Sequence, residues 1–297
     1  MQFISTDIES LMKIGINTFL FASPFTNEST VWFAQFKKWG FDFVEIVVED
    51  PTLVDPEFVL RELQNAGLEC RVVCAATGPG RDLRGTRKEQ VDCLYYVQEL
   101  FNVAVLWGAK VVTGPIYSSV GRAELTSKSD YLKQWKIVVD NLRLLASVAE
   151  TMDLKIGIEP LNRYETDFIN TCEQALKLIE DVGSTALGIH LDTFHMNLEE
   201  KYQADAILKA GDKLVLLHAS GSDRGTPGKD HIDWESIFKA LQAINYQGDI
   251  SIESFTPDVK VIAKAASIWR KIEPSSESIA TDGLRFLRGH LHRLHTV

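Results

Sequence analysis

Short runs rich in apolar and β-branched residues alternate with longer amphipathic segments along almost the whole chain. Each short run has the length and composition of a strand, and each longer segment has the spacing of a helix with one apolar face. The eight runs that we predict to be strands span residues 13–19, 41–48, 69–76, 109–115, 154–160, 186–192, 213–219 and 248–254.

The segments between these strands are predicted to be helices. Gly67 follows the helix predicted over residues 56–66, in the position where a glycine commonly terminates a helix. The full set of predicted helices lies near residues 31–39, 56–66, 86–107, 128–152, 172–182, 203–210 and 234–244, with further helical segments within 258–291.

Eight strand–helix units in succession predict the fold class α/β, as a (β/α)₈ TIM barrel with a single domain. Alternating units of this kind form a parallel sheet, and eight of them favour a closed barrel over an open sheet. No low-complexity linker or change of composition interrupts the units. We interpret residues 1–12 as a short N-terminal leader and residues 13–297 as the catalytic barrel domain.

The amino-acid composition limits the kinds of molecule that the protein is expected to bind. The chain has 31 Lys and Arg against 41 Asp and Glu, a formal net charge of −10, which disfavours nucleic acid as a partner. No stretch reaches 18 uninterrupted apolar residues, so we predict no membrane span. The opening residues MQFISTDIESL lack the apolar core of a secretory signal, and the four cysteines lack CxxC spacing, so we expect a cytoplasmic protein with reduced thiols.

Ligand-type residues end four consecutive predicted strands. The fifth and eighth strands end almost alike, in IGIE and ISIE, and period-two alternation sends the isoleucines outward and Glu159 and Glu253 inward. The sixth strand ends in Asp192 and the seventh in His218. Active sites of such barrels lie at the carboxyl ends of the strands. We therefore expect these four side chains to converge at the barrel mouth.

Three carboxylates and an imidazole at one point favour a bound divalent cation, because the carboxylates repel one another when they are not neutralised. Oxygen ligands with a single nitrogen suit Mn²⁺, Mg²⁺ or Co²⁺ better than a thiolate-type zinc site. The alternative is that each residue separately forms an ion pair or caps a loop. The predicted metal ligands are Glu159, Asp192, His218 and Glu253.

Three further candidates follow these strand ends, namely Glu165, His195 and Arg224. Their side chains can bind sugar oxygens, although each could instead be a loop or helix residue without a function. His190 has the same parity as Asp192, so it points into the barrel, and we interpret it as a packed, hydrogen-bonded core residue.

At these segments the chain resembles the D-tagatose and D-psicose (allulose) 3-epimerases. This family of ketose 3-epimerases includes L-ribulose 3-epimerases and belongs to the xylose-isomerase-like barrels. The resemblance extends from KIGINTF to the C-terminal helices, and LDTFHMN is its most specific part. The similar segments are IEPLNRYE (158–165), LDTFHMNLEE (191–200), residues 218–228 and SIESF (251–255).

The resemblance implies that the four strand-end side chains hold one divalent ion, usually Mn²⁺, in a homodimer or homotetramer. It also implies that Glu165, His195 and Arg224 bind the ketose oxygens around the carbonyl. The first strand and its following loop, with Phe19 and Phe21, match the family less well. This region is the one expected to meet the far end of the sugar.

The expected reaction interconverts the C3 epimers of free ketoses: D-tagatose and D-sorbose, D-fructose and D-psicose, or L-ribulose and L-xylulose. Glu159 and Glu253 would remove and return the C3 proton on opposite faces, through a cis-enediolate held by the metal. The nearest alternative is an aldose–ketose or hydroxypyruvate isomerase on the same scaffold.

Two further classes are disfavoured. A DNA-repair endonuclease of this barrel type needs more histidines and a basic face, and a non-catalytic sugar-binding barrel does not need two opposed glutamates.

Overall fold

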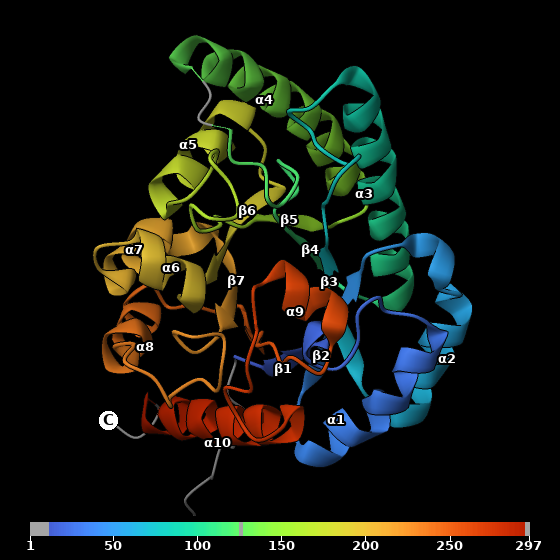
Figure 1. The fold of residues 1–297 in the computed structure, drawn as a ribbon, viewed down its shortest axis with the longest axis vertical. Helices are drawn as coiled ribbons and strands as arrows, with labels where there is room; N and C mark the ends of the chain where they lie inside the picture. The colour runs from blue at the N-terminus through green and yellow to red at the C-terminus, as the bar shows by residue number, and fades with distance from the viewer. Residues whose placement is uncertain (1–11, 125–126, 295–297) are drawn as a thin grey trace, which may run out of the picture.

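The computed structural model describes residues 12–124 and 127–294, so the predicted leader lies, apart from Met12, outside the described residues. Eight parallel strands close into a barrel, in which each strand pairs with the next and β8 pairs with β1. The predicted (β/α)₈ TIM barrel is therefore confirmed (Figure 1). The strands are β1 (Ile14–Asn17), β2 (Phe43–Val48), β3 (Glu69–Ala75), β4 (Val111–Gly114), β5 (Lys155–Ile158), β6 (Leu187–Asp192), β7 (Leu214–Ala219) and β8 (Asp249–Ile252).

Helices surround the strands and cover the outer face of the barrel (Figure 1). No helix in the described part of the chain is both long and apolar enough to cross a membrane. The α-helices are α1 (Phe33–Trp39), α2 (Pro56–Ala66), α3 (Arg87–Trp107), α4 (Lys128–Thr151), α5 (Cys172–Val182), α6 (Thr193–Glu199), α7 (Gln203–Ala210), α8 (Trp234–Ala243), α9 (Lys260–Ala265) and α10 (Ser276–Leu294). Shorter 3₁₀ turns are η1 (Thr18–Leu20), η2 (Asn27–Trp32), η3 (Pro51–Leu53) and η4 (Gly211–Lys213).

Capping residues set the helix boundaries. The Thr86 side chain accepts a hydrogen bond from the Glu89 backbone N–H, and the Glu89 carboxylate reaches back to the Thr86 N–H, which starts α3. Gly67 ends α2 with φ of 60°, a left-handed conformation that glycine adopts without steric cost. Both bounds agree with the predicted helices 86–107 and 56–66 to within one residue.

Apart from the exact ends of strands and helices, the structure differs from the predicted elements in two places. The segment 258–291 divides into α9 and α10, because Ser275 starts a new helix by accepting the Ser278 backbone N–H at 3.0 Å. Helix α6 was not among the predicted helices. It begins directly at the end of β6, where the Asp192 carboxylate accepts the Phe194 N–H and so caps the helix.

The barrel interior changes from apolar to polar toward the carboxyl ends of the strands. Phe43, Val72 and Leu216 form a buried apolar cluster inside the barrel, separate from the core between strands and helices. Two residues further along these strands the interior becomes polar, and burying polar groups is costly unless they are paired or bind a ligand. The fully buried polar residues of this layer are Asn17, Glu45, Thr113, His190, His218 and Ser251.

Candidate metal centre and active site

Four buried ligand-type side chains, among them His218 of the polar layer, converge at the carboxyl ends of the strands. Glu159 and Glu253 follow β5 and β8, while Asp192 ends β6 and is paired in register with His218 of β7. One ligand atom from each of the four lies within 4.8 Å of the others. The structure thus brings together the whole predicted ligand set.

His218 is oriented so that one ring nitrogen faces the carboxylates. Its Nε2 lies 3.0 and 2.8 Å from the two carboxylate oxygens of Glu45. Its Nδ1 has no hydrogen-bond partner and lies 3.4 Å from Glu253 Oε2. Oxygens of Asp192 and Glu159 follow at 3.9 and 4.0 Å.

This arrangement fits a divalent cation. The Glu45 carboxylate holds a proton on His218 Nε2 and leaves Nδ1 facing the other carboxylates. Burial acts to lower the pKa of His218, but Glu45 and Glu253 raise it well above its ordinary value, so that a cation bound at Nδ1 would take the place of a proton there. A carboxylate behind a ligand histidine is the usual way to fix its tautomer and orientation. A ring nitrogen and three carboxylates directed at one point suit a metal ion with oxygen ligands and one nitrogen.

The two glutamates of the cluster have different electrostatic environments. Burial raises the pKa of Glu159, and the nearby charge of Glu253 raises it further. Burial also acts to raise the pKa of Glu253, but His218 and Arg224 outweigh it and lower this pKa to about 2. Environments that separate two carboxyl pKa values in this way are typical of acid–base sites.

Arg224 links the cluster to the cavity wall. Its Nη1 donates to Asp192 Oδ2 at 2.6 Å and to Glu253 Oε2 at 3.1 Å. Its guanidinium contacts two aromatic rings, with Cζ 4.2 Å from the Phe194 centroid and 4.8 Å from that of Phe255. Its backbone has φ of 66°, which is uncommon for a residue other than glycine and typical of functional sites.

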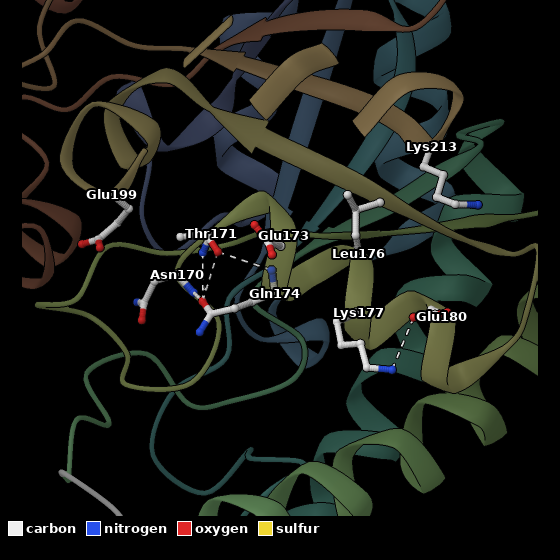
Figure 2. A pocket seen from close by; sticks show the side chains of 9 residues that line it. All are labelled: Asn170, Thr171, Glu173, Gln174, Leu176, Lys177, Glu180, Glu199 and Lys213. Atoms are coloured by element: carbon white, nitrogen blue, oxygen red, sulfur yellow. Dashed lines mark hydrogen bonds and ion pairs between the residues drawn. The ribbon is translucent and has the colours of Figure 1, made fainter. Parts of the chain in front are cut away.

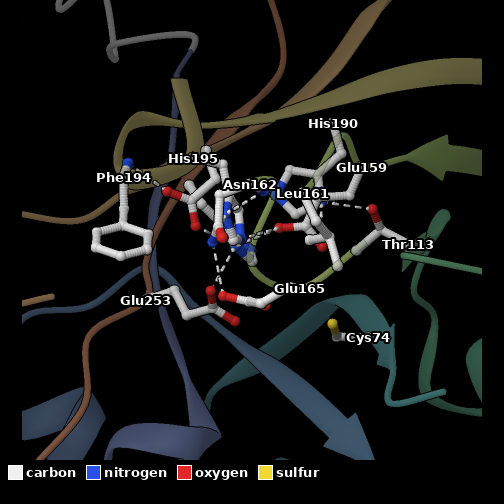
Figure 3. A network of polar contacts seen from close by, with 12 residues as sticks. Cys74, Thr113, Glu159, Leu161, Asn162, Glu165, His190, Phe194, His195 and Glu253 are labelled. Atoms are coloured by element: carbon white, nitrogen blue, oxygen red, sulfur yellow. Dashed lines mark hydrogen bonds and ion pairs between the residues drawn. The ribbon is translucent and has the colours of Figure 1, made fainter. Parts of the chain in front are cut away.

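His195 is held in one orientation by the loop after β5. The Asn162 backbone N–H donates to His195 Nδ1 at 3.1 Å, and Arg224 Nη2 lies 2.9 Å from Nε2 on the other side of the ring. Burial and then Arg224 lower the pKa of His195, which keeps the ring neutral. Asn162 Nδ2 also donates to Glu165 at 2.7 Å, so one loop positions two of the three predicted substrate-binding residues (Figure 3).

His190 is buried and hydrogen-bonded, as predicted. Its Nδ1 lies 2.9 Å from Thr113 Oγ1 and 3.7 Å from Glu159 Oε2. Gly157 leaves room for this contact, because a Cβ atom there would lie 2.5 Å from Thr113 Oγ1. With Glu159 and His218, His190 forms a second, smaller group that could hold a metal.

Sequence reasoning missed two residues that contact the cluster. Glu45 is the single charged residue within the strand FVEIVV, and its inward parity was a signal that it would reach the barrel interior. Asn17 ends β1, and its Nδ2 donates to Glu253 Oε1 at 3.3 Å. Both come from the N-terminal strands, where no ligand-type motif was apparent.

A cavity of about 260 Å³ lies beside the cluster at the barrel mouth. This volume lies just below the usual range of about 300–1,000 Å³ for ligand pockets, which suits a molecule as small as a monosaccharide. Helix α9, orange-red in Figure 1, contributes to its wall. Its charged side is formed by Glu159, Glu165, His195, Arg224 and Glu253, and its apolar wall includes Phe19, Pro115, Val120, Leu161, Phe255, Val261, Ile262, Ala265 and Ala266.

A larger open hollow of about 940 Å³ lies outside the barrel, beside α5 (Figure 2). Its polar groups bond to one another: Lys177 pairs with Glu180, and Gln174 accepts hydrogen bonds from Asn170 and Thr171. It lacks the convergence of buried titratable groups that marks the barrel mouth, so we place the functional site in the smaller cavity.

Comparison with known proteins shows which family the sequence resembles. The sequence model described as xylose isomerase-like TIM barrel matches residues 33–290. A probable ketose 3-epimerase of Synechocystis sp. is 35% identical over 93% of this chain and 96% of its own. A D-psicose 3-epimerase of Enterocloster bolteae is 35% identical over 91% of each chain.

A solved structure supports the same assignment. The D-allulose 3-epimerase of Methylomonas sp. in complex with D-allulose has a TM-score of 0.88 and 26% identity, over 94% of this chain and 97% of that one. The chain therefore belongs to the xylose isomerase-like TIM barrel family and, within it, to the ketose 3-epimerases, which are isomerases acting on carbohydrates.

Proposed function

We propose that this protein is a metal-dependent epimerase that inverts C3 of a free ketose. D-Tagatose and D-sorbose, D-fructose and D-psicose, and L-ribulose and L-xylulose are the candidate pairs. The observation that carries the proposal is the convergence of three buried carboxylates and the unpartnered His218 Nδ1 beside a cavity of monosaccharide size.

Glu159, Asp192, His218 and Glu253 would hold one divalent ion, for which we propose Mn²⁺, with Mg²⁺ and Co²⁺ as the alternatives. When bound, such an ion supplies Lewis-acid stabilisation of the negative charge that develops on the substrate oxygens. Glu45 fixes the ligand histidine, since its carboxylate contacts Nε2 and leaves Nδ1 for the ion.

Glu159 and Glu253 would move the proton. They extend from strands β5 and β8, which are three positions apart around the ring, so they approach the cavity from different sides. One carboxylate removes the C3 proton from one face of the sugar, and the other returns a proton to the opposite face. The two residues exchange these roles when the reaction runs in reverse.

Arg224, His195 and Glu165 would orient the carbonyl end of the ketose. Arg224 and His195 line the cavity side by side, and the guanidinium, which can only donate hydrogen bonds, suits oxygens at C1 and C2. The Glu165 carboxylate accepts from Asn162 and can also accept from a sugar hydroxyl. Burial of His195 and Arg224, and partial burial of Glu165, reduce the competition of water for these hydrogen bonds.

The test is a panel of ketoses incubated with the Mn²⁺-loaded protein in D₂O and followed by NMR. The proposal predicts a C3 epimer from at least one of D-fructose, D-tagatose and L-ribulose, with one deuterium incorporated at C3. Aldose products would instead identify an aldose–ketose isomerase, and turnover of hydroxypyruvate alone would identify a hydroxypyruvate isomerase. The absence of any isotope exchange would refute an enzymatic role.

A further inference from the structure

The cavity has a second half, formed by the loops after β1, β2 and β3. This half contributes Phe19, Ser23, Glu49, Ala75 and Thr77 to the lining. Most of the surface around these residues is apolar, and the Thr77 hydroxyl already donates to two backbone carbonyls, those of Pro115 and Ser118. Glu49 is the acidic residue that these three loops add to the cavity, and the proton-transfer chemistry does not use it.

Glu49 lies across the barrel mouth from the carbonyl-binding residues. It directly follows β2, two positions beyond the inward-facing Val47 and four beyond Glu45. In a closed ring of eight strands β2 is four positions from β6, the strand that ends in Asp192 and leads into His195. The two groups therefore line opposite sides of the same cavity.

The Glu49 carboxylate has acceptor positions to spare. Its Oε1 accepts from Ser23 Oγ at 2.7 Å and its Oε2 from the Phe25 N–H at 2.9 Å. A carboxylate offers about four lone-pair sites, so about two remain. In the described part of the chain no cation forms an ion pair with this carboxylate, and Arg81 donates instead to the Glu49 carbonyl and lies over the Tyr96 ring.

A half-exposed carboxylate on a protein surface satisfies its remaining sites with water, but Glu49 faces a small cavity. Burial raises the pKa of Glu49, and the bonds from Phe25 and Ser23 offset this only in part. A ligand that donates a hydrogen bond would stabilise the charged form in place of water. The neighbouring apolar wall, with Val120 and Ile262, would contact only C–H groups of such a ligand.

We infer that Glu49 binds the terminal hydroxyl of the ketose, at the end of the sugar remote from C1, and so determines substrate specificity. This inference rests on the proposed function, in which Glu165, His195 and Arg224 hold the carbonyl end. A sugar held there can extend toward the loops after β1–β3, where Glu49 supplies the carboxylate, a stronger acceptor than the hydroxyls of Ser23 and Thr77. Ser23 orients the Glu49 carboxylate through a hydrogen bond but does not itself bind the terminal hydroxyl.

The test is a double-perturbation cycle, in which the terminal hydroxyl of the sugar and the carboxylate of Glu49 are removed separately and together. The Mn²⁺-loaded wild-type protein and the variants Glu49→Gln and Ser23→Ala are assayed for kcat/KM. The substrates are whichever of D-fructose and D-tagatose reacts faster and its 6-deoxy analogue. The cycle is needed because loss of the 6-hydroxyl also changes the ring forms of the free sugar.

We expect the wild type to favour the parent sugar over the 6-deoxy analogue by roughly 10- to 100-fold, the range for a hydrogen bond to a charged group. Glu49→Gln should lower kcat/KM for the parent sugar by a similar factor and change it little for the analogue. Ser23→Ala should keep the wild-type ratio between the two sugars, because the carboxylate remains.

An equal loss on both sugars in Glu49→Gln, reproduced in Ser23→Ala, would show that Glu49 only anchors the β1 loop and would overturn the inference. Should Glu49→Gln fail to fold, as judged by its melting temperature, the wild-type ratio decides, and a ratio near one overturns it. A wild type that produces no C3 epimer from any ketose refutes the proposed function itself. Failure of the inference about Glu49 can therefore be distinguished from failure of the proposed function.

Discussion

The two halves of the barrel mouth are built from the same repeating unit but carry different chemistry. Strands β1–β4 end in Asn17, Val48, Ala75 and Gly114, and apart from Asn17 these residues have no polar side chain. Strands β5–β8 end at or next to the four candidate metal ligands. The difference shows that the fold supplies positions, and that the residues at the strand ends decide what each position does.

Residues of strands β1–β4 nevertheless contact the candidate metal ligands that follow or end strands β5–β8. Glu45 of β2 contacts His218 of β7, and Asn17 of β1 contacts Glu253 beyond β8. The N-terminal half thus contributes residues that position the ligands, while its loops contribute the apolar wall and Glu49. Each of the following predictions tests this division of roles between the N-terminal and C-terminal halves of the barrel.

Removal of the ion should have the largest effect, because one cation serves all four ligands of the C-terminal half. We expect treatment with EDTA to abolish epimerisation and Mn²⁺ or Co²⁺ to restore it. A bound ion should also stabilise the fold, by about 2.7 kcal/mol at a free concentration 100 times its Kd. A melting temperature that is the same with and without Mn²⁺, together with full activity in a metal-free preparation, would contradict the metal centre.

Glu159→Gln and Glu253→Gln should each lower kcat by at least about 10²-fold, the lower end of the contribution from a positioned acid or base. Each variant should retain the folded barrel by circular dichroism, because the change is nearly isosteric. Glu57→Gln, an exposed glutamate in α2, is the matched control and should leave kcat unchanged. Substantial epimerase activity in either active-site variant would refute the two-base assignment.

Glu45→Gln should weaken Mn²⁺ binding by roughly 10- to 100-fold, the usual cost of losing a carboxylate behind a ligand histidine. The matched variant, of the glutamate that directly follows the same strand, is Glu49→Gln, which should leave the affinity for Mn²⁺ unchanged. Titration calorimetry with Mn²⁺ alone measures both without reference to turnover. Equal affinities in the two variants would show that Glu45 does not position His218.

Ile262→Val should have the smallest effect, since it removes one methylene from the apolar wall. A buried methylene contributes about 0.8 kcal/mol, which corresponds to about a fourfold rise in KM. Because the contact is uniform through the reaction, kcat should stay unchanged. A kcat reduced as strongly as in Glu253→Gln would contradict the separation of wall and catalytic half.

Local sequence patterns were sufficient to predict the barrel architecture. The alternation of strand and helix signals, and the parity that turns Glu159 inward, depend on residues close together in the chain. Strand ends were predicted too far in most cases, such as 248–254 against β8 at Asp249–Ile252, because a strand ends where its neighbours stop pairing. Helix α6 was missed since its cap, Asp192, is also the strand-end residue.

The sequence by itself determined the order of the elements, the closed ring of eight strands and which side chains meet at its mouth, because periodicity and strand parity are local properties. Only the tertiary structure decided the contacts that cross the ring. Glu45 and His218 lie 173 positions apart, and their contact depends on barrel closure, not on any pattern in either strand. Glu159 and Glu253 follow strands of nearly identical sequence, and their opposite pKa shifts arise in the same way from burial and from charges that distant segments place beside them.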